Sequence, residues 1–128
     1  MDINYLYGIA SKENINVFDY KFDDINGVYI DELKTIGLST RLLSPNKKCV
    51  LAEELGHYYC NATYPLSCKD KTLVDKAEYR AKKWAVKALI SPSDLEKVKL
   101  LGLKYKWEIA EYLGVTEWVA EKALEYIY

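Results

Sequence analysis

The chain has 128 residues, half of them hydrophobic, and a formal net charge of -1 at pH 7. This length suits one domain with a sizeable core, and the balanced charge gives no indication of a polyanion-binding protein. The three cysteines form no closely spaced pair, which favours reduced thiols over a disulfide framework or a cysteine zinc site. We find no signal-peptide pattern and no membrane-spanning apolar run, so the sequence predicts a cytoplasmic protein.

The first third of the chain predicts one helix followed by three short strands. Residues 2–13 place apolar side chains at helical spacing, with Asp2 as a possible N-cap. Residues 15–22 alternate between apolar and polar side chains, as in a half-buried strand. Residues 28–30 and 35–39 are two further β-rich runs around a turn. We expect the three strands to form an antiparallel meander beneath the helices.

Two longer helices follow. The first is predicted over residues 45–60, with Ser44 as N-cap and Pro45 at the first helical position, where its missing N–H is not needed. The second is predicted over residues 72–90, where alanines recur along an apolar stripe. Because these side chains are small, we expect another helix or the sheet to approach this stripe closely.

The last third predicts a short helix and then a helix-turn-helix-like hairpin. A capping box from Ser93 to Glu96 would start the short helix. In the hairpin, Ala110 permits close crossing of the two helices, and Gly114 permits the tight turn between them. The second helix is predicted over residues 116–128. The side chains with which we expect it to complete the core are Trp118, Val119, Leu124 and Ile127.

The charge of this hairpin argues against DNA binding. Glu117, Glu121 and Glu125 form an acidic stripe on its second helix, against a single lysine, Lys122. A recognition helix brings cations to phosphates and hydrogen-bonding side chains to base edges, so DNA would repel this one. A DNA-binding regulator is therefore the function that the sequence supports least.

The only histidine of the chain, His57, lies in the helix predicted over residues 45–60. Glu53 precedes it by four residues, and residues four apart lie on one helix face, so the two side chains can converge on one point. Glu54 projects about 100° away, beside that point. This is the layout of the zinc-peptidase helix HExxH, in which a general-base glutamate follows the first of two ligands, but Glu53 replaces the first histidine.

The same residues have plainer interpretations. A helix with two acids and one histidine is more often a solvated face than a metal site. The spacing from Glu54 to His57 also occurs in di-iron helix bundles, but these need a second such pair, which one histidine cannot supply. For zinc, the best third ligand is Glu78 on the next helix. Its alternative role, which the sequence alone favours, is an exposed ion pair with Lys82.

Three segments share their order and separation with one family of proteins. Residues 52–59 contain Glu-Glu-Leu-Gly-His, residues 78–85 match the pattern E-x-x-A-x-x-aromatic-A, and residues 89–92 read Leu-Ile-Ser-Pro. Together they resemble the ImmA/IrrE family of metallo-endopeptidases, most closely the short versions from prophages and mobile elements. The resemblance implies an α+β fold, with a zincin-like core over residues 1–92 and a helical extension over residues 93–128 packed on the same domain.

By position, the resemblance implies that His57 and Glu78 are zinc ligands and that Glu54 is the general base. Glu53 occupies the first ligand position but departs from the family pattern, which leaves open whether it binds the metal and whether the protein is active. Two anionic ligands would nearly neutralise the ion and weaken its effect on a bound water molecule.

Two functions follow from this resemblance. The first is a zinc endopeptidase that cleaves or inactivates a helix-turn-helix repressor. Zinc would hold the attacking water, Glu54 would take its proton, and a tyrosine would help to stabilise the oxyanion. The candidate tyrosines are Tyr58, Tyr59 and Tyr79. The second function is a non-catalytic anti-repressor that binds its partner without cutting it. For both we expect a protein partner, and contact with neither nucleic acid nor membrane.

Overall fold

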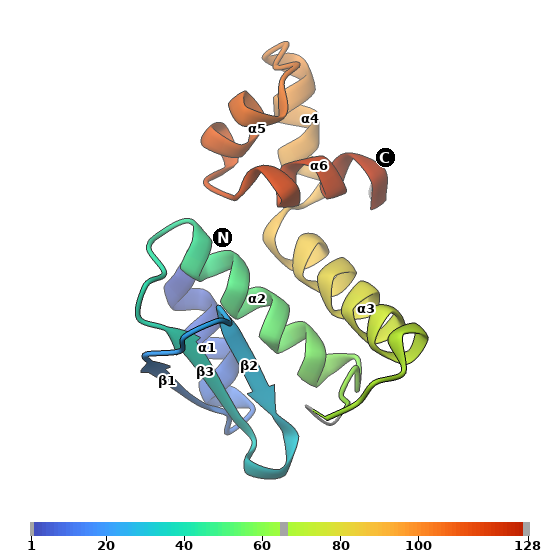
Figure 1. Cartoon of the computed structure of the whole chain (residues 1–128). Helices are drawn as coiled ribbons and strands as arrows, with labels where there is room; N and C mark the ends of the chain where they lie inside the picture. Colours follow the sequence, from blue (N-terminus) through green and yellow to red (C-terminus); the bar gives the residue numbers. More distant parts are fainter. Residues whose placement is uncertain (1, 65–66, 127–128) are drawn as a thin grey trace.

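A small sheet with helices α1 and α2 forms one part of the molecule, and helix α3 connects it to three C-terminal helices (Figure 1). The computed structural model describes residues 2–64 and 67–126. Within these residues it contains six α-helices, one short 3-10 helix and a three-stranded sheet, so the predicted α+β class is confirmed. None of the described helices is long and apolar enough to cross a membrane.

The first helix, α1, spans Ile3–Lys12 and begins as predicted. The side chain of Asp2 accepts a hydrogen bond from the backbone N–H of Asn4 at 3.0 Å, which satisfies one of the free donors at the helix start. Leu6 and Ala10, one turn apart, are buried and direct this face of α1 into the core.

The sheet is mixed, not the antiparallel meander expected from the sequence. Strands β1 (Asn16–Tyr20), β2 (Gly27–Ile30) and β3 (Thr35–Ser39) lie in the order β1-β3-β2. β3 pairs with β1 in parallel and with β2 antiparallel. All five residues of β3 are buried, so it takes the centre, where a neighbour covers each edge. β1 is mostly exposed instead of half-buried, which suits an edge strand.

The two longer helices lie within one residue of their predicted limits. α2 spans Asn46–Tyr59 and packs on the sheet, and α3 spans Lys71–Leu89 and packs along α2. The predicted start of α2 is wrong by one position, because Pro45 itself occupies the N-cap and no side chain caps the helix. Ser44 therefore has no capping role.

The short helix α4 spans Pro92–Leu100, and its capping box lies two residues before the predicted one. Ser91 accepts a hydrogen bond from the N–H of Asp94, and the Asp94 carboxylate accepts one from the N–H of Ser91. The prediction that Ser93 and Glu96 form this box is wrong, because Pro92 fits the first helical position and makes Ser91 the N-cap.

The C-terminal hairpin is present, with α5 over Lys106–Leu113 and α6 over Glu117–Tyr126. Gly114 joins them in the left-handed conformation, with φ of 67°. The residues of α6 that enter the core are small: Val119, Ala120 and Ala123.

Two of the four side chains predicted to enter the core from α6 are not confirmed. The prediction for Leu124 is wrong, since its side chain is 39% exposed, and Ile127 lies outside the described residues. One continuous core cluster includes side chains from α1 through α6. The division into residues 1–92 and 93–128 remains a prediction.

Candidate active site

Helices α2 and α3 lie in close contact where Gly56 faces Ala81. A Cβ atom on Gly56 would lie 2.4 Å from the backbone oxygen of Ala81, so a larger residue cannot occupy this position without moving a helix. Glu53 lies three residues before Gly56, and Glu78 lies three residues before Ala81. The close contact therefore brings the acidic side chains of two helices to the same place.

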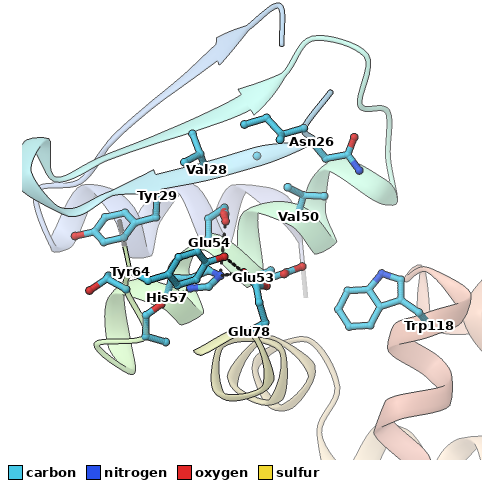
Figure 2. A pocket seen from close by; sticks show the side chains of 14 residues that line it. Asn26, Val28, Tyr29, Val50, Glu53, Glu54, His57, Tyr64, Glu78 and Trp118 are labelled. Carbon is cyan, nitrogen blue, oxygen red and sulfur yellow. Dashed lines mark hydrogen bonds and ion pairs between the residues drawn. The ribbon is translucent and has the colours of Figure 1, made fainter. Parts of the chain in front are cut away.

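Glu53, His57 and Glu78 converge beside this contact (Figure 2). One ligand atom from each residue lies within 4.8 Å of the other two. The Nε2 atom of His57 is 3.4 Å from Oε1 of Glu78, whose side chain is 29% exposed. The alternative in which Glu78 is a surface partner of Lys82 is wrong, because its carboxylate faces His57.

The imidazole ring of His57 is held in one orientation by the chain that follows α2. Its Nδ1 atom lies 2.5 Å from the backbone oxygen of Ala62, a residue that is fully buried. Because a carbonyl oxygen can only accept, Nδ1 carries the proton and donates it. Nε2 faces the carboxylates and, in the metal-free chain, holds the second proton of the ring toward Glu78. When that proton leaves, the lone pair of Nε2 is available in the arrangement of histidines that bind metal ions.

Glu54 lies on α2 beside this group, where a general base is expected. Its side chain is buried, and Oε1 is 4.0 Å from Nε2 of His57. Oε2 is buried and has no hydrogen-bond partner among the described residues. Glu54 nevertheless lines a cavity, so a molecule in that cavity could provide the missing partner. A buried acceptor without a partner costs free energy, so its position in the cleft wall indicates a role with a molecule bound there.

The electrostatics of the group reflect three carboxylates around one imidazole. Burial, helped by a hydrogen bond with Glu78, raises the pKa of Glu53 to about 7. Burial also raises the pKa of Glu54 to about 8. The hydrogen bond with His57 is the main cause that lowers the pKa of Glu78 to about 2. Burial alone would lower the pKa of His57, but its hydrogen bond with Glu78 and the charge of Glu54 raise it to about 9.

These residues fit a zinc ion. One imidazole nitrogen and two carboxylate oxygens are donors that zinc accepts, and three protein ligands are the number found in catalytic zinc sites. The hydrogen bond to Ala62 orients the nitrogen donor. A divalent cation would also stabilise the buried carboxylates, whose burial is the main cause of the raised pKa values of Glu53 and Glu54.

Tyr64 is a residue of this site that the sequence did not reveal. Its hydroxyl donates a hydrogen bond to Oε1 of Glu78 at 2.5 Å, and its ring packs edge-on to His57, with ring centroids 6.3 Å apart. Tyr64 follows α2 in a segment without helical or strand periodicity. Only the return of the chain at Ala62, which is not visible as a sequence pattern, places this tyrosine beside His57 and Glu78.

The tyrosines proposed from sequence proximity do not reach the group. The hydroxyl of Tyr58 donates to Glu13 at 2.7 Å. The ring of Tyr59 stacks on that of Trp84, with centroids 4.9 Å apart. Tyr79 is half exposed on α3, away from the cavity at Glu54. Residues that follow one another on a helix point in different directions, so closeness in sequence did not place them in the site.

The group lies in the wall of a cavity of about 420 Å³. Its other walls come from strand β2 and the residues before it, from residues 62–64, and from α6 (Figure 2). α6 contributes Trp118, which the sequence predicted only as a core residue. The cavity is lined by Ile25, Asn26, Gly27, Val28, Tyr29, Val50, Glu53, Glu54, His57, Ala62, Thr63, Tyr64, Glu78 and Trp118.

The α+β fold and the Glu–His–Glu group beside a buried glutamate define a metallopeptidase-type domain. Residues 10–125 match the sequence profile of the Peptidase_M78 family, described as the IrrE N-terminal-like domain. The chain therefore belongs to this family, and the resemblance drawn from residues 52–59, 78–85 and 89–92 is confirmed. A comparison with curated proteins gives no match to the chain.

Proposed function

We propose that the chain is a zinc-dependent endopeptidase of phage or mobile-element origin that cleaves or inactivates a helix-turn-helix repressor. The observation that carries the proposal is the convergence of Glu53, His57 and Glu78 next to Glu54 in the wall of one cavity. Membership of the Peptidase_M78 family supports the class of reaction. The choice of a repressor as substrate rests on the resemblance to ImmA/IrrE proteins.

Three side chains would hold the ion: His57 through Nε2, and Glu53 and Glu78 through their carboxylates. When bound, zinc would make a water molecule more acidic and would polarise the carbonyl group of the peptide bond. Two carboxylates neutralise more of the ion's charge than one carboxylate and two histidines would. We therefore expect slower catalysis than in a site where a histidine occupies the position of Glu53.

Glu54 would move the proton. Its Oε2 atom, which has no hydrogen-bond partner within the described residues, is available to accept a proton from the attacking water. Burial raises the pKa of Glu54 to about 8 in the metal-free chain, and a bound cation would favour the carboxylate form that can act as a base. The same carboxyl group can then give the proton to the amine that leaves when the peptide bond breaks.

Strand β2 offers a place for the backbone of a substrate. It pairs only with β3 among the described strands, so its other edge has unpaired N–H and C=O groups. The residues of β2 line the cavity that contains Glu54. An extended peptide added along this edge would lie across Glu54, held by backbone hydrogen bonds that do not depend on its sequence.

The hairpin supports a protein partner and argues against a nucleic acid. Glu117, Glu121 and Glu125 are all exposed on α6. Glu121 pairs with Lys106 at 3.8 Å, and Glu125 pairs with Lys122 at 2.9 Å, so the lysines nearest this face are engaged with acidic groups. This surface has little positive charge to attract phosphates.

The first test is the zinc content of the purified chain and of three variants. We expect about one zinc per chain in the wild type and in Glu54→Gln, and a loss of zinc in His57→Ala. The matched control is Glu96→Gln, which changes an exposed carboxylate on α4 and should keep the metal. Absence of zinc from the wild type, even after incubation with the ion, would contradict the proposed site.

The second test separates cutting from binding. We expect the wild type to cleave a helix-turn-helix repressor encoded beside its gene, and Glu54→Gln to bind it but cleave it at least about a hundredfold more slowly. Glu53 in place of a histidine favours a second function, a non-catalytic anti-repressor. If Glu54→Gln inactivates the repressor as well as the wild type does, this second function is correct and the endopeptidase proposal fails.

A further inference from the structure

The C-terminal hairpin supplies one wall of the cleft through Trp118. In Figure 2 its indole ring stands at one end of the labelled residues, on the side of Val50 and Asn26, whereas Tyr29 and Tyr64 stand at the other end. All of these residues line the same cavity. Glu53 and Glu54 lie between the two ends, so a peptide that passes the general base would also meet this ring.

The position of the Trp118 ring is fixed by the residues that follow it. Val119, Ala120 and Ala123 are fully buried, and α6 packs against α3, the helix that carries Glu78. The ring itself is partly buried and packs against the same core cluster. Trp118 is therefore a supported part of the cleft wall, not a side chain that happens to lie on the surface.

Trp107 provides a comparison within the same hairpin. It lies on α5 with 56% of its surface exposed, and its ring stacks on that of Tyr105 with an angle of 10° between the ring planes. Trp107 is not among the residues that line the cavity. Of these two hairpin tryptophans, only Trp118 is directed at the site.

The end of the cleft at Trp118 includes apolar surface. Val50, on α2, lines it together with the indole ring, and Asn26 lies on the same side. The carboxylate of Glu53 lies next to this end. An aromatic ring beside a branched aliphatic side chain favours an apolar group, and the nearby carboxylates disfavour an acidic one.

We propose that Trp118 and Val50 form a subsite for a bulky apolar side chain of the peptide, next to the bond that is cut. As a statement about cleavage, this rests on the proposed function; as a statement about peptide binding, it does not. Burial of a leucine or phenylalanine side chain in such a subsite corresponds to a preference over alanine of at least about tenfold.

The test uses a library of randomised decapeptides in two arms. In the first arm, the zinc-loaded wild type cuts the library, and sequencing of the products gives the preference at each position beside the cut. In the second arm, the Glu54→Gln variant captures peptides, and sequencing of the bound fraction gives the binding preference. Both arms are repeated with Trp118→Ala and with the control Trp107→Ala.

We expect leucine or phenylalanine to be favoured over alanine at one position by at least about tenfold, and aspartate to be disfavoured there. Trp118→Ala should reduce this preference below about threefold, whereas Trp107→Ala should leave it unchanged. Val50→Phe provides a second route, since it narrows the subsite from α2 without removing the indole ring. It should shift the preference at that position toward alanine, whether or not Trp118→Ala folds.

The two arms separate the subsite from the enzyme. If the wild type cuts peptides and neither Trp118→Ala nor Val50→Phe changes the preference, the subsite is wrong and the endopeptidase stands. If the wild type cuts nothing but the Glu54→Gln variant captures apolar peptides in a way that depends on Trp118, the subsite stands and the endopeptidase fails. If neither arm shows any preference, the subsite is overturned.

Discussion

Two pairs of helices meet at a glycine in this chain, for different physical reasons. Gly56 lies inside α2, and a Cβ atom there would be 2.4 Å from the backbone oxygen of Ala81 on α3. Gly114 ends α5 with φ of 67°, and a Cβ atom there would be 3.5 Å from the ammonium group of Lys48, which is an ordinary contact. The first position needs the space of a glycine, and the second needs its backbone freedom.

The two contacts also hold different kinds of residues. Beside Gly56 the chain gathers Glu53, His57 and Glu78, which are charged or polar groups held close together. Beyond Gly114, α6 buries the small apolar side chains of Val119, Ala120 and Ala123 and extends Trp118 to the cleft. We infer that the α2–α3 contact determines the chemistry of the site, whereas the hairpin determines the shape of one of its walls.

Gly56→Ala is the substitution that we expect to disturb the α2–α3 contact most. The added Cβ cannot fit at 2.4 Å from a backbone atom, so the two helices must move apart. We expect the free energy of unfolding in urea to fall by about 3 kcal/mol, at the upper end of overpacking effects. The affinity for zinc should fall as well, because Glu78 would move away from His57.

The matched control for this variant is Gly8→Ala in the middle of α1, where a Cβ atom would meet nothing within 4 Å. It should stabilise the chain by roughly 0.5–1 kcal/mol, because alanine favours a helix more than glycine does. A Gly56→Ala variant with the stability and zinc affinity of the wild type would show that the contact does not position the ligands.

The buried carboxylates at the same contact predict how the stability of the zinc-free chain depends on pH. Burial raises the pKa of Glu53 to about 7 and that of Glu54 to about 8, above the value of 4.5 for an exposed glutamate. Between pH 4.5 and these raised values, the folded chain holds protons that the unfolded chain has released, so the free energy of unfolding falls as the pH rises. His57 acts in the same direction above pH 6.5. Because these groups face one another and do not titrate independently, the loss is smaller than the sum of the separate shifts, and we expect about 2 kcal/mol from pH 5 to pH 8.

The measurement is urea unfolding of chelator-treated protein across this pH range. Glu54→Gln should make the fall in unfolding free energy with pH less steep, because an amide does not titrate, while Glu53 and His57 still do. With zinc added, the free energy of unfolding should instead rise with pH, since the ion binds the deprotonated ligands that higher pH favours. A flat curve for the zinc-free wild type would mean that the carboxylates are better solvated than their burial indicates.

The contrast between the two contacts also explains what could be predicted from the sequence. Glu53, Glu54 and His57 could be placed relative to one another because they share a helix, whose period fixes the direction of each side chain. Glu78 could be proposed because it lies on a helix whose alanine stripe indicated a close neighbour. Regular local structure was enough for the residues of α2, whereas Glu78 was preferred as a ligand only through the resemblance to the family.

Tyr64, Trp118 and the strand order could not be predicted because they depend on how distant parts of the chain meet. Tyr64 is positioned by the return of the backbone after α2, and Trp118 by the packing of α6 on α3. Parallel pairing of β1 with β3 places the most buried strand at the centre, a choice made by the whole core and not by alternation within one strand.

Tyr64 also helps to position Glu78 at the α2–α3 contact. Its hydroxyl donates a hydrogen bond to Glu78 from the segment that follows α2. Tyr64→Phe removes this hydrogen bond and leaves the ring beside His57. We expect the affinity for zinc, measured by competition with a chromophoric chelator, to fall about tenfold. The control is Tyr58→Phe, whose hydroxyl bonds to Glu13 outside the cavity, and it should keep the wild-type affinity. Equal effects of the two variants would contradict this role.

The smallest effect is expected from Gly114→Ala, which changes the hairpin alone. Alanine in the left-handed conformation costs about 1 kcal/mol, and the new Cβ meets only the ammonium group of Lys48 at an ordinary distance. Unfolding in urea should show this loss, whereas zinc affinity should equal that of the wild type, because α2, α3 and Tyr64 are untouched. If zinc affinity falls together with stability, the hairpin helps to position the ligands, and the chemistry of the site cannot be assigned to the α2–α3 contact alone.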